Sequence, residues 1–412
     1  MKFLFVFICL LLVLQLVYPF VTILMAQIFH RTHQQQPIPE ALNYPTLNYA
    51  CIITAYRNAA IARPLVDSLL HQTHPNLGIY LVADECPEFD FALSDQRLVV
   101  LKPSSPLRLK AKSLLYALEN FNQLHDYVVV FDADNLAHPQ FLEEINHFAA
   151  AGFRCVQGQR KAKNLDTIYA ALDSMGEHYK NYIERDIPYH LGGSAVISGS
   201  GMATETAQYK AYLTGPEITQ GQLQWKRMLQ EDKILQNFLV RKGERIAYAR
   251  RAIVFDEKVE TGKDVETQRS RWLFSYFQNV PNALDIVKKG ILGLNFNQLY
   301  FGCVTLALPM FIQLGMAMIM MVLAIFIAPS WSLILFAAMA IFALTIIWAL
   351  YLDGAPAAVL RAVWQVPKFV FWQFAGLFKM RNPDKYFKHT EHRKIISLNE
   401  VPGQTAEPEE KA

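Results

Sequence analysis

The chain has 412 residues, of which 52% are hydrophobic, and a formal net charge of +3. Its mean hydropathy of +0.14 is high for a soluble protein. The small net charge provides no electrostatic footprint for nucleic acid, so we expect no nucleic-acid partner. The length allows two or three domains.

The apolar residues are concentrated in two stretches, at residues 3–29 and 299–352, the second broken only at Pro329-Ser330. Each is longer than the roughly 20 helical residues that cross a bilayer. A cleaved signal peptide is the alternative for the first stretch. However, it exceeds a signal core of about 7–15 residues, and no small-x-small cleavage site follows it. We predict a transmembrane helix at residues 1–30 and a transmembrane hairpin at residues 290–354.

Between these stretches, a polar linker is predicted at residues 31–48 and a single domain at residues 49–289. Short apolar runs alternate there with helical patterns, which is typical of an α/β fold with a mostly parallel sheet covered on both faces. Strands are predicted at residues 49–54, 79–83, 98–101, 127–131, 153–157, 194–198 and 245–255. Helices are predicted at residues 60–71, 111–121, 165–183, 265–276 and 282–289, with two more that begin at Pro139 and near Glu231.

Polar side chains stand at the ends of three predicted strands. Thr54, Asp84 and Asp132 each lie at the last residue of an apolar run or directly after it. In open α/β sheets the ligand crevice lies outside the carboxyl ends of the strands. The three residues therefore predict a ligand site at one edge of the sheet.

Asp132 and Asp134 form an Asp-x-Asp pair at one of these strand ends. Mg²⁺ is commonly held by one or two carboxylates together with substrate phosphates. The pair therefore predicts a site for Mg²⁺ or Mn²⁺. The alternatives are a solvated turn, or the N-cap of the helix that begins at Pro139.

A second pair of carboxylates, Glu231 and Asp232, stands where another helix is predicted to begin. We assign Asp232 as the candidate general base, with Glu231 either orienting it or standing beside it without a role of its own. The alternative is a pair of acidic residues that complements the helix dipole.

Gln268, Arg271 and Trp272 are spaced at i, i+3 and i+4, which puts them on one face of a helix. An arginine can pair bidentately with a diphosphate, and the tryptophan offers a flat wall to a sugar ring. An amphipathic helix with its tryptophan at the level of the lipid headgroups is the alternative.

Taken in order, Asp132-Ala133-Asp134, Glu231-Asp232 and Gln268-x-x-Arg271-Trp272 resemble the membrane-embedded family 2 glycosyltransferases. That group includes the synthases of cellulose, chitin, hyaluronan and poly-N-acetylglucosamine. The resemblance implies a GT-A-type domain and a metal-dependent transfer from a nucleotide sugar, expected to be UDP-linked, to a glycan acceptor at the membrane. With one candidate base and no dedicated nucleophile, the transfer is expected to invert the anomeric centre, in a processive or a single step. The alternatives are transfer of one sugar to a polyprenyl-phosphate lipid and a catalytically inactive membrane scaffold.

The resemblance also implies a nucleotide pocket. The residues that match its positions are Thr54, Tyr56, Asp84, Lys110, Lys112 and Asp132. The chain departs from the family at two places. Ala59 replaces the acidic residue of the Pro-x-x-Asn-Glu segment found in many relatives, and the lysine segment lacks its usual preceding glycine and following asparagine.

Basic residues gather beside the apolar stretches, which by the positive-inside rule places those flanks in the cytoplasm. Nucleotide sugars are made in the cytoplasm, so we expect the catalytic domain to face it, from the inner membrane of a bacterium. Residues 355–395 mix aromatic, proline and basic residues, which predicts an interfacial or re-entrant helix followed by a basic segment. Residues 396–412 are expected to be a flexible tail.

Overall fold

The computed structural model describes residues 2–32, 45–91, 93–224, 229–366, 370 and 395–401. Most of the predicted linker, the basic segment after Val370 and the end of the tail therefore lie outside the described residues.

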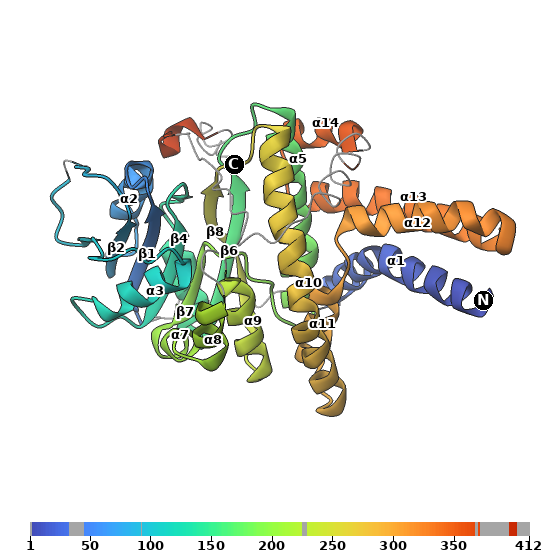
Figure 1. Ribbon diagram of the computed structural model, residues 1–412, viewed down its shortest axis with the longest axis horizontal. Coiled ribbons are helices and arrows are strands. Elements are labelled where there is room, and N and C mark those ends of the chain that lie inside the picture. The colour runs from blue at the N-terminus through green and yellow to red at the C-terminus, as the bar shows by residue number, and fades with distance from the viewer. Residues whose placement is uncertain are drawn as a thin grey trace.

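One sheet of eight strands forms the centre of the molecule, in the order β3-β2-β1-β4-β7-β6-β8-β5 (Figure 1). Neighbouring strands are parallel from β3 to β4 and between β6 and β8, whereas β7 is antiparallel to both of its neighbours and β5 is antiparallel to β8. The strands are β1 Tyr49–Tyr56, β2 Leu77–Asp84, β3 Leu98–Leu101, β4 Tyr127–Asp132, β5 Leu136–Ala137, β6 Cys155–Ala162, β7 Met202–Glu205 and β8 Ile246–Asp256.

Helices cover both faces of this sheet, because successive side chains of a strand point to opposite faces. On β1, Cys51 and Ile53 pack with the helices α2 and α4, while Ala50 and Ile52 pack with α3, α7 and α9. The α/β fold with a mostly parallel sheet is thus confirmed. The helices are η1 Ala60–Ala62, α2 Arg63–Leu70, α3 Lys110–Glu119, α4 Phe141–Ala150, α7 Thr206–Leu213, α8 Pro216–Gln224 and α9 Glu231–Arg241.

The strand predicted at residues 194–198 is wrong, since the strand of this region is β7. The backbone N–H groups of the segment bond mainly outside any ladder. That of Ile197 donates to Gln236 Oε1 at 3.1 Å, and that of Ser198 donates to Gln157 Oε1 at 3.0 Å. The apolar pattern comes from burial alone, which the sequence cannot distinguish from pairing.

Two predicted helical regions are longer than expected. The helix predicted at residues 165–183 is α5 (Ile168–Tyr179), which continues as the π-helix η2 (Lys180–Asp186) and then as α6 (Ile187–His190). The two helices predicted at residues 265–276 and 282–289 are one helix, α10 (Gly262–Leu292), which runs through Pro281.

Among the described residues, three helices are long and apolar enough to cross a membrane: α1 (Lys2–Thr32), α12 (Met310–Ile327) and α13 (Pro329–Leu352). They lie together and extend from one side of the sheet domain (Figure 1). The first half of the predicted transmembrane hairpin is interrupted. Its initial helix, α11 (Phe296–Leu306), ends before Pro309 and packs against α10 instead of joining the membrane helices. Proline disfavours helical backbone in the residue before it, which separates α11 from α12.

The approach of α11 to α10 depends on two glycines. A Cβ on Gly290 would lie 2.4 Å from the backbone of Leu299, and one on Gly302 would lie 2.6 Å from Val287. Beyond α13, the short helix α14 (Ala357–Ala362) and the 3-10 turn η3 (Val363–Gln365) begin the predicted interfacial segment, and α14 packs on α5. The turn η4 (Leu398–Glu400) is the last described element.

Candidate active site

Lys110, the first residue of α3, connects three parts of the chain that are far apart in sequence. Its Nζ lies 2.6 Å from Asp132 Oδ1 at the end of β4, donates to the carbonyl oxygen of Gly199 at 2.9 Å, and lies 3.7 Å from Glu231 Oε1 on α9. Burial alone would lower the pKa of Lys110, but the carboxylates of Asp132 and Glu231 outweigh it, so the pKa is raised. Lys110 is therefore a charged anchor at this edge of the sheet.

The loop that receives Lys110 depends on its glycines. Gly199 and Gly201 have φ values of +79° and +63°, in the left-handed region that favours glycine. A Cβ on Gly201 would lie 2.4 Å from Val254, and one on Gly199 would contact Asp232 at 3.6 Å. The two left-handed residues therefore require glycine, and at Gly201 the close approach of Val254 requires it as well.

Glu231 and Asp232 occupy the first turn of α9, as predicted. Burial raises the pKa of Glu231 to about 7, with Lys110 opposing that shift and Asp232 adding to it. Asp232 accepts the backbone N–H of Lys233 through Oδ1 at 2.8 Å and lines the neighbouring cavities. The two carboxylates therefore differ in environment, since Glu231 is held beside Lys110 while Asp232 faces open space.

A cavity of about 310 Å³ brings the sequence motifs together. Its lining residues come from β4, α3, α9 and α10 and from the glycine loop: Lys110, Asp132, Ser198, Gly199, Glu231, Asp232, Arg271, Trp272 and Ser275. Motifs more than 130 residues apart in the chain thus meet in one space. It adjoins a larger cavity of about 1340 Å³, which shares Asp132, Asp232 and Trp272 with it.

The Asp-x-Asp pair offers carboxylate oxygens at this junction. Asp132 is half-exposed, while Asp134 is buried and accepts the backbone N–H of Glu257 at 3.3 Å. Asp256, at the end of β8, also lines the larger cavity, and its Oδ1 is buried with no hydrogen-bond partner. Within the described part of the chain no three metal-binding side chains form a preformed cluster. Carboxylates that rely on substrate phosphates to complete the shell nevertheless suit Mg²⁺ or Mn²⁺, and the unsatisfied oxygen of Asp256 fits that need.

The residues predicted for the nucleotide do not all line a cavity. Thr54 and Tyr56 line the larger one. The carboxylate of Asp84 is instead occupied, because it accepts the backbone N–H groups of Leu107 at 2.9 Å and Arg108 at 2.7 Å. Asp84 thereby positions the turn that precedes Lys110.

Lys112 lies on α3 but lines neither cavity. Positions i and i+2 of a helix face different sides, so Lys110 and Lys112 cannot both face the site.

Three residues at the same edge of the sheet have strained backbone conformations, since Arg57, Glu85 and Arg108 have φ values of 62°, 50° and 61°. Such strained positions cluster at ligand sites.

The motif on α10 is shared between the two cavities. Gln268 lines the larger one, Arg271 lines the smaller one, and Trp272 lines both. Two cations contact the Trp272 ring: Lys180 Nζ lies 4.7 Å and Arg269 Cζ 4.4 Å from the ring centroid. Trp272 is therefore held at the junction by cation–π contacts.

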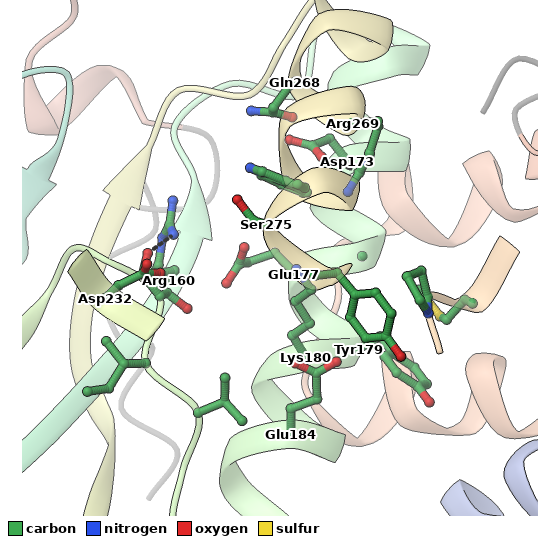
Figure 2. Close-up of a pocket in the computed structure, with 18 of the residues that line it drawn as sticks. Arg160, Asp173, Glu177, Tyr179, Lys180, Glu184, Asp232, Gln268, Arg269 and Ser275 are labelled. Carbon is green, nitrogen blue, oxygen red and sulfur yellow. Dashed lines mark hydrogen bonds and ion pairs between the residues drawn. The ribbon is translucent and has the colours of Figure 1, made fainter. Parts of the chain in front are cut away.

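Sequence reasoning missed a network of charged residues on the wall of the larger cavity. Arg160 pairs with Asp256 at 2.6 Å, Lys258 pairs with Asp256 at 2.9 Å, and Arg185 pairs with Glu177 at 2.8 Å. Despite burial, these cations hold the pKa of Glu177 well below its ordinary value. Only Asp256 carried a signal, as an acidic residue at the end of a predicted strand. Figure 2 shows Arg160 and Asp232 on one side of this cavity and Glu177 on the helix opposite.

The sheet, its acidic strand ends and the lysine-anchored glycine loop define a GT-A-type glycosyltransferase. The chain belongs to glycosyltransferase family 2, because the family model described as "Glycosyltransferase like family 2" matches residues 45–275. It is therefore an enzyme that transfers sugar from a nucleotide-sugar donor.

Among solved structures, the chain is similar to the mannosyltransferase PcManGT from Pyrobaculum calidifontis in complex with GDP-Man and Mn²⁺. The two are 16% identical, with a TM-score of 0.51 over 89% of this chain and 97% of that one, which shows a shared fold. S. aureus TarS 1-349 is 14% identical, with a TM-score of 0.36 over 58% of this chain and 66% of that one. No curated protein matches the chain.

Proposed function

We propose that this enzyme transfers a sugar, with inversion and with the help of a divalent cation, from a nucleotide sugar to an acceptor at a membrane. The observation that carries the proposal is the position of Lys110, which joins Asp132 at 2.6 Å to Glu231 at 3.7 Å on the wall of the cavity that Asp232 and Trp272 also line. A metal-binding carboxylate, a candidate base and a platform for a sugar are thus within one small space.

In this proposal Asp232 is the general base. Its carboxylate takes the proton of the acceptor hydroxyl as the oxygen forms a bond to the anomeric carbon. The bond from that carbon to the diphosphate breaks on the opposite side, which inverts the centre. The side chain of Glu231 is held beside Lys110, so we assign it to positioning Lys110.

Asp132 and Asp134 are the proposed ligands of Mg²⁺ or Mn²⁺, which would neutralise charge on the leaving diphosphate. PcManGT, which has the same fold, was solved with GDP-Man and Mn²⁺. The family resemblance implies a UDP-linked donor, held by Thr54 and Tyr56, with Arg271 beside the diphosphate. We also propose that the domain faces the cytoplasm, where nucleotide sugars are made.

The test replaces Asp134 with Asn, which preserves shape but removes the charge. Membranes that contain the Asp134→Asn variant should show only background transfer from a panel of labelled nucleotide sugars. EDTA should abolish transfer by the wild type, and added Mn²⁺ should restore it. The exposed Asp67 supplies the control, because Asp67→Asn should leave transfer unchanged. Full activity of Asp134→Asn, or of the wild type in EDTA, contradicts the metal assignment. The size of the products separates single transfer from polymerisation.

A further inference from the structure

The larger cavity extends from the active site to the membrane helices. Its far end is lined by Gln15 and Tyr18 of α1, Gln313 of α12 and Ile346 of α13. In the described structure, the Oε1 atoms of Gln15 and Gln313 are buried without a hydrogen-bond partner. Polar side chains on membrane helices are costly and face functional cavities. The space beside the active site thus extends to partly polar side chains of helices that can cross a bilayer.

Several basic residues line this cavity, among them Arg269, Lys233 and Lys180. Arg269 is neutralised by Asp173 at 2.7 Å, and Lys233 Nζ donates to the carbonyl oxygen of Ile197 at 3.4 Å. Lys180 differs from both, because within the described residues its ammonium group has neither an ion-pair nor a hydrogen-bond partner and instead contacts the Trp272 ring. Figure 2 shows Lys180 on the helix opposite Asp232.

The charge of Lys180 is incompletely balanced by its surroundings. Burial lowers its pKa, Glu184 and Glu177 offset only part of that shift, and Arg269 and Lys233 add to it. A bound anion would stabilise the charged form of Lys180, because it would supply the counter-charge that the described residues do not provide.

Lys180 is also held in a specific place by an unusual backbone. It is the first residue of the π-helix η2, and π-helical turns occur frequently at functional sites. The wide turn lies between α5 and α6, which pack against α14 and α1 respectively. Lys180 therefore sits where the catalytic domain meets the membrane helices.

We propose that the acceptor is a lipid-linked sugar phosphate, with its phosphate bound by Lys180 and its apolar chain directed along the part of the cavity lined by α1, α12 and α13. This proposal rests on the proposed function and names its acceptor class. The sugar hydroxyl lies between Trp272 and Asp232 and loses its proton to Asp232, as a bond forms to the donor's anomeric carbon and the bond to the diphosphate breaks. Phosphate and lipid remain unchanged.

The test measures binding without any donor, in nanodiscs of uncharged phosphatidylcholine. The probes are phytanyl phosphate, phytanol and glucose 1-phosphate, which separate the anionic lipid, the apolar chain and the free phosphate. We expect wild type to bind phytanyl phosphate at least about 10-fold more tightly than either other probe. Lys180→Met should weaken binding of phytanyl phosphate by about 10- to 100-fold, the share of one charge-assisted hydrogen bond, and leave phytanol unaffected.

Two further variants distinguish charge at this site from charge in general. Lys180→Arg should retain most of the affinity, and Lys210→Met, at an exposed lysine on α7, should retain all of it. Unchanged affinity of Lys180→Met for phytanyl phosphate overturns the proposal, as does equal binding of glucose 1-phosphate, which would indicate a soluble anion. Transfer of label from nucleotide sugars is measured separately, in membranes that contain the same proteins. Its absence in wild type would contradict the proposed function and leave the binding result to be judged independently.

Discussion

Lys110 lines the smaller of the two adjoining cavities and Lys180 lines the larger one, and the two lysines differ in their electrostatic surroundings. Lys110 has carboxylates at 2.6 Å and 3.7 Å, and its pKa is raised. Lys180 contacts an aromatic ring, and its pKa is lowered. Both lie in sites that disfavour a charge, so the difference comes from their partners.

Under the two proposals made above, one active site binds its two ligands in different ways. At the donor end the charges are already balanced, and Lys110 holds the strand end, the glycine loop and α9 in a fixed arrangement. At the acceptor end, the charge of Lys180 is not balanced in an ion pair by any carboxylate of the described residues. Fixed geometry suits a site where bonds break, whereas an uncompensated charge favours binding of an anion.

The largest effect is expected from Asp232→Asn, at the residue that lines both cavities. Because the general base is lost while the shape is kept, transfer should slow by about 10²–10⁴-fold, with the affinity for the nucleotide sugar near that of wild type. Rates at saturating donor and acceptor, together with direct donor binding, provide the check. If the affinity falls and the saturated rate survives, Asp232 belongs to the binding pocket.

The stability of the two lysine variants tests the comparison directly. Lys110→Met leaves Asp132 and Glu231 without their cation, and should cost about 1–3 kcal/mol of unfolding free energy, below the value for a fully buried pair because Asp132 is 40% exposed. Lys180→Met removes an incompletely balanced charge and should not destabilise the ligand-free protein. Thermal unfolding of both variants in one detergent is the measurement. Equal destabilisation would mean that the two sites do not differ.

A smaller, pH-dependent effect is expected at Glu231. Its pKa is about 7 in the folded protein against an ordinary value of 4.5. The ionised form is therefore disfavoured by folding, and the cost grows as the pH rises from about 4.5 and is complete above about 7. Glu231→Gln removes this cost and should stabilise the protein by at most about 3 kcal/mol at pH 8, and by much less at pH 5.

Lys110 limits that gain, since it loses one of its two carboxylate partners in Glu231→Gln. The exposed Glu88 supplies the control, because Glu88→Gln should not alter the unfolding midpoint at either pH. A gain from Glu231→Gln that is larger at pH 5 than at pH 8 would contradict the raised pKa. Comparing the midpoints of the three proteins at both pH values decides the matter.

Local patterns in the sequence were enough to predict most strands of the sheet and to identify the motifs whose residues line the smaller cavity. The strands around Tyr49 and Tyr127 are buried on both faces, so each reads as an unbroken apolar run. The polar residues that end these strands fall at one sheet edge by topology alone. The prediction at residues 194–198 was wrong, because side-chain acceptors such as Gln157 and Gln236 took the place of a neighbouring strand.

By itself the sequence determined the α/β domain, the apolar stretches at its two sides, and the motif residues Asp132, Asp232 and Trp272, which line one cavity. These follow from hydrophobic period and from short motifs, which are local properties of the chain. Only the tertiary structure decided that Asp84 orders a turn, that Lys112 faces away, and that Lys180 lies beside Trp272. Those assignments depend on which groups become neighbours and how much water they lose. The residues next to a group in the sequence determine neither its neighbours in space nor the extent of its burial.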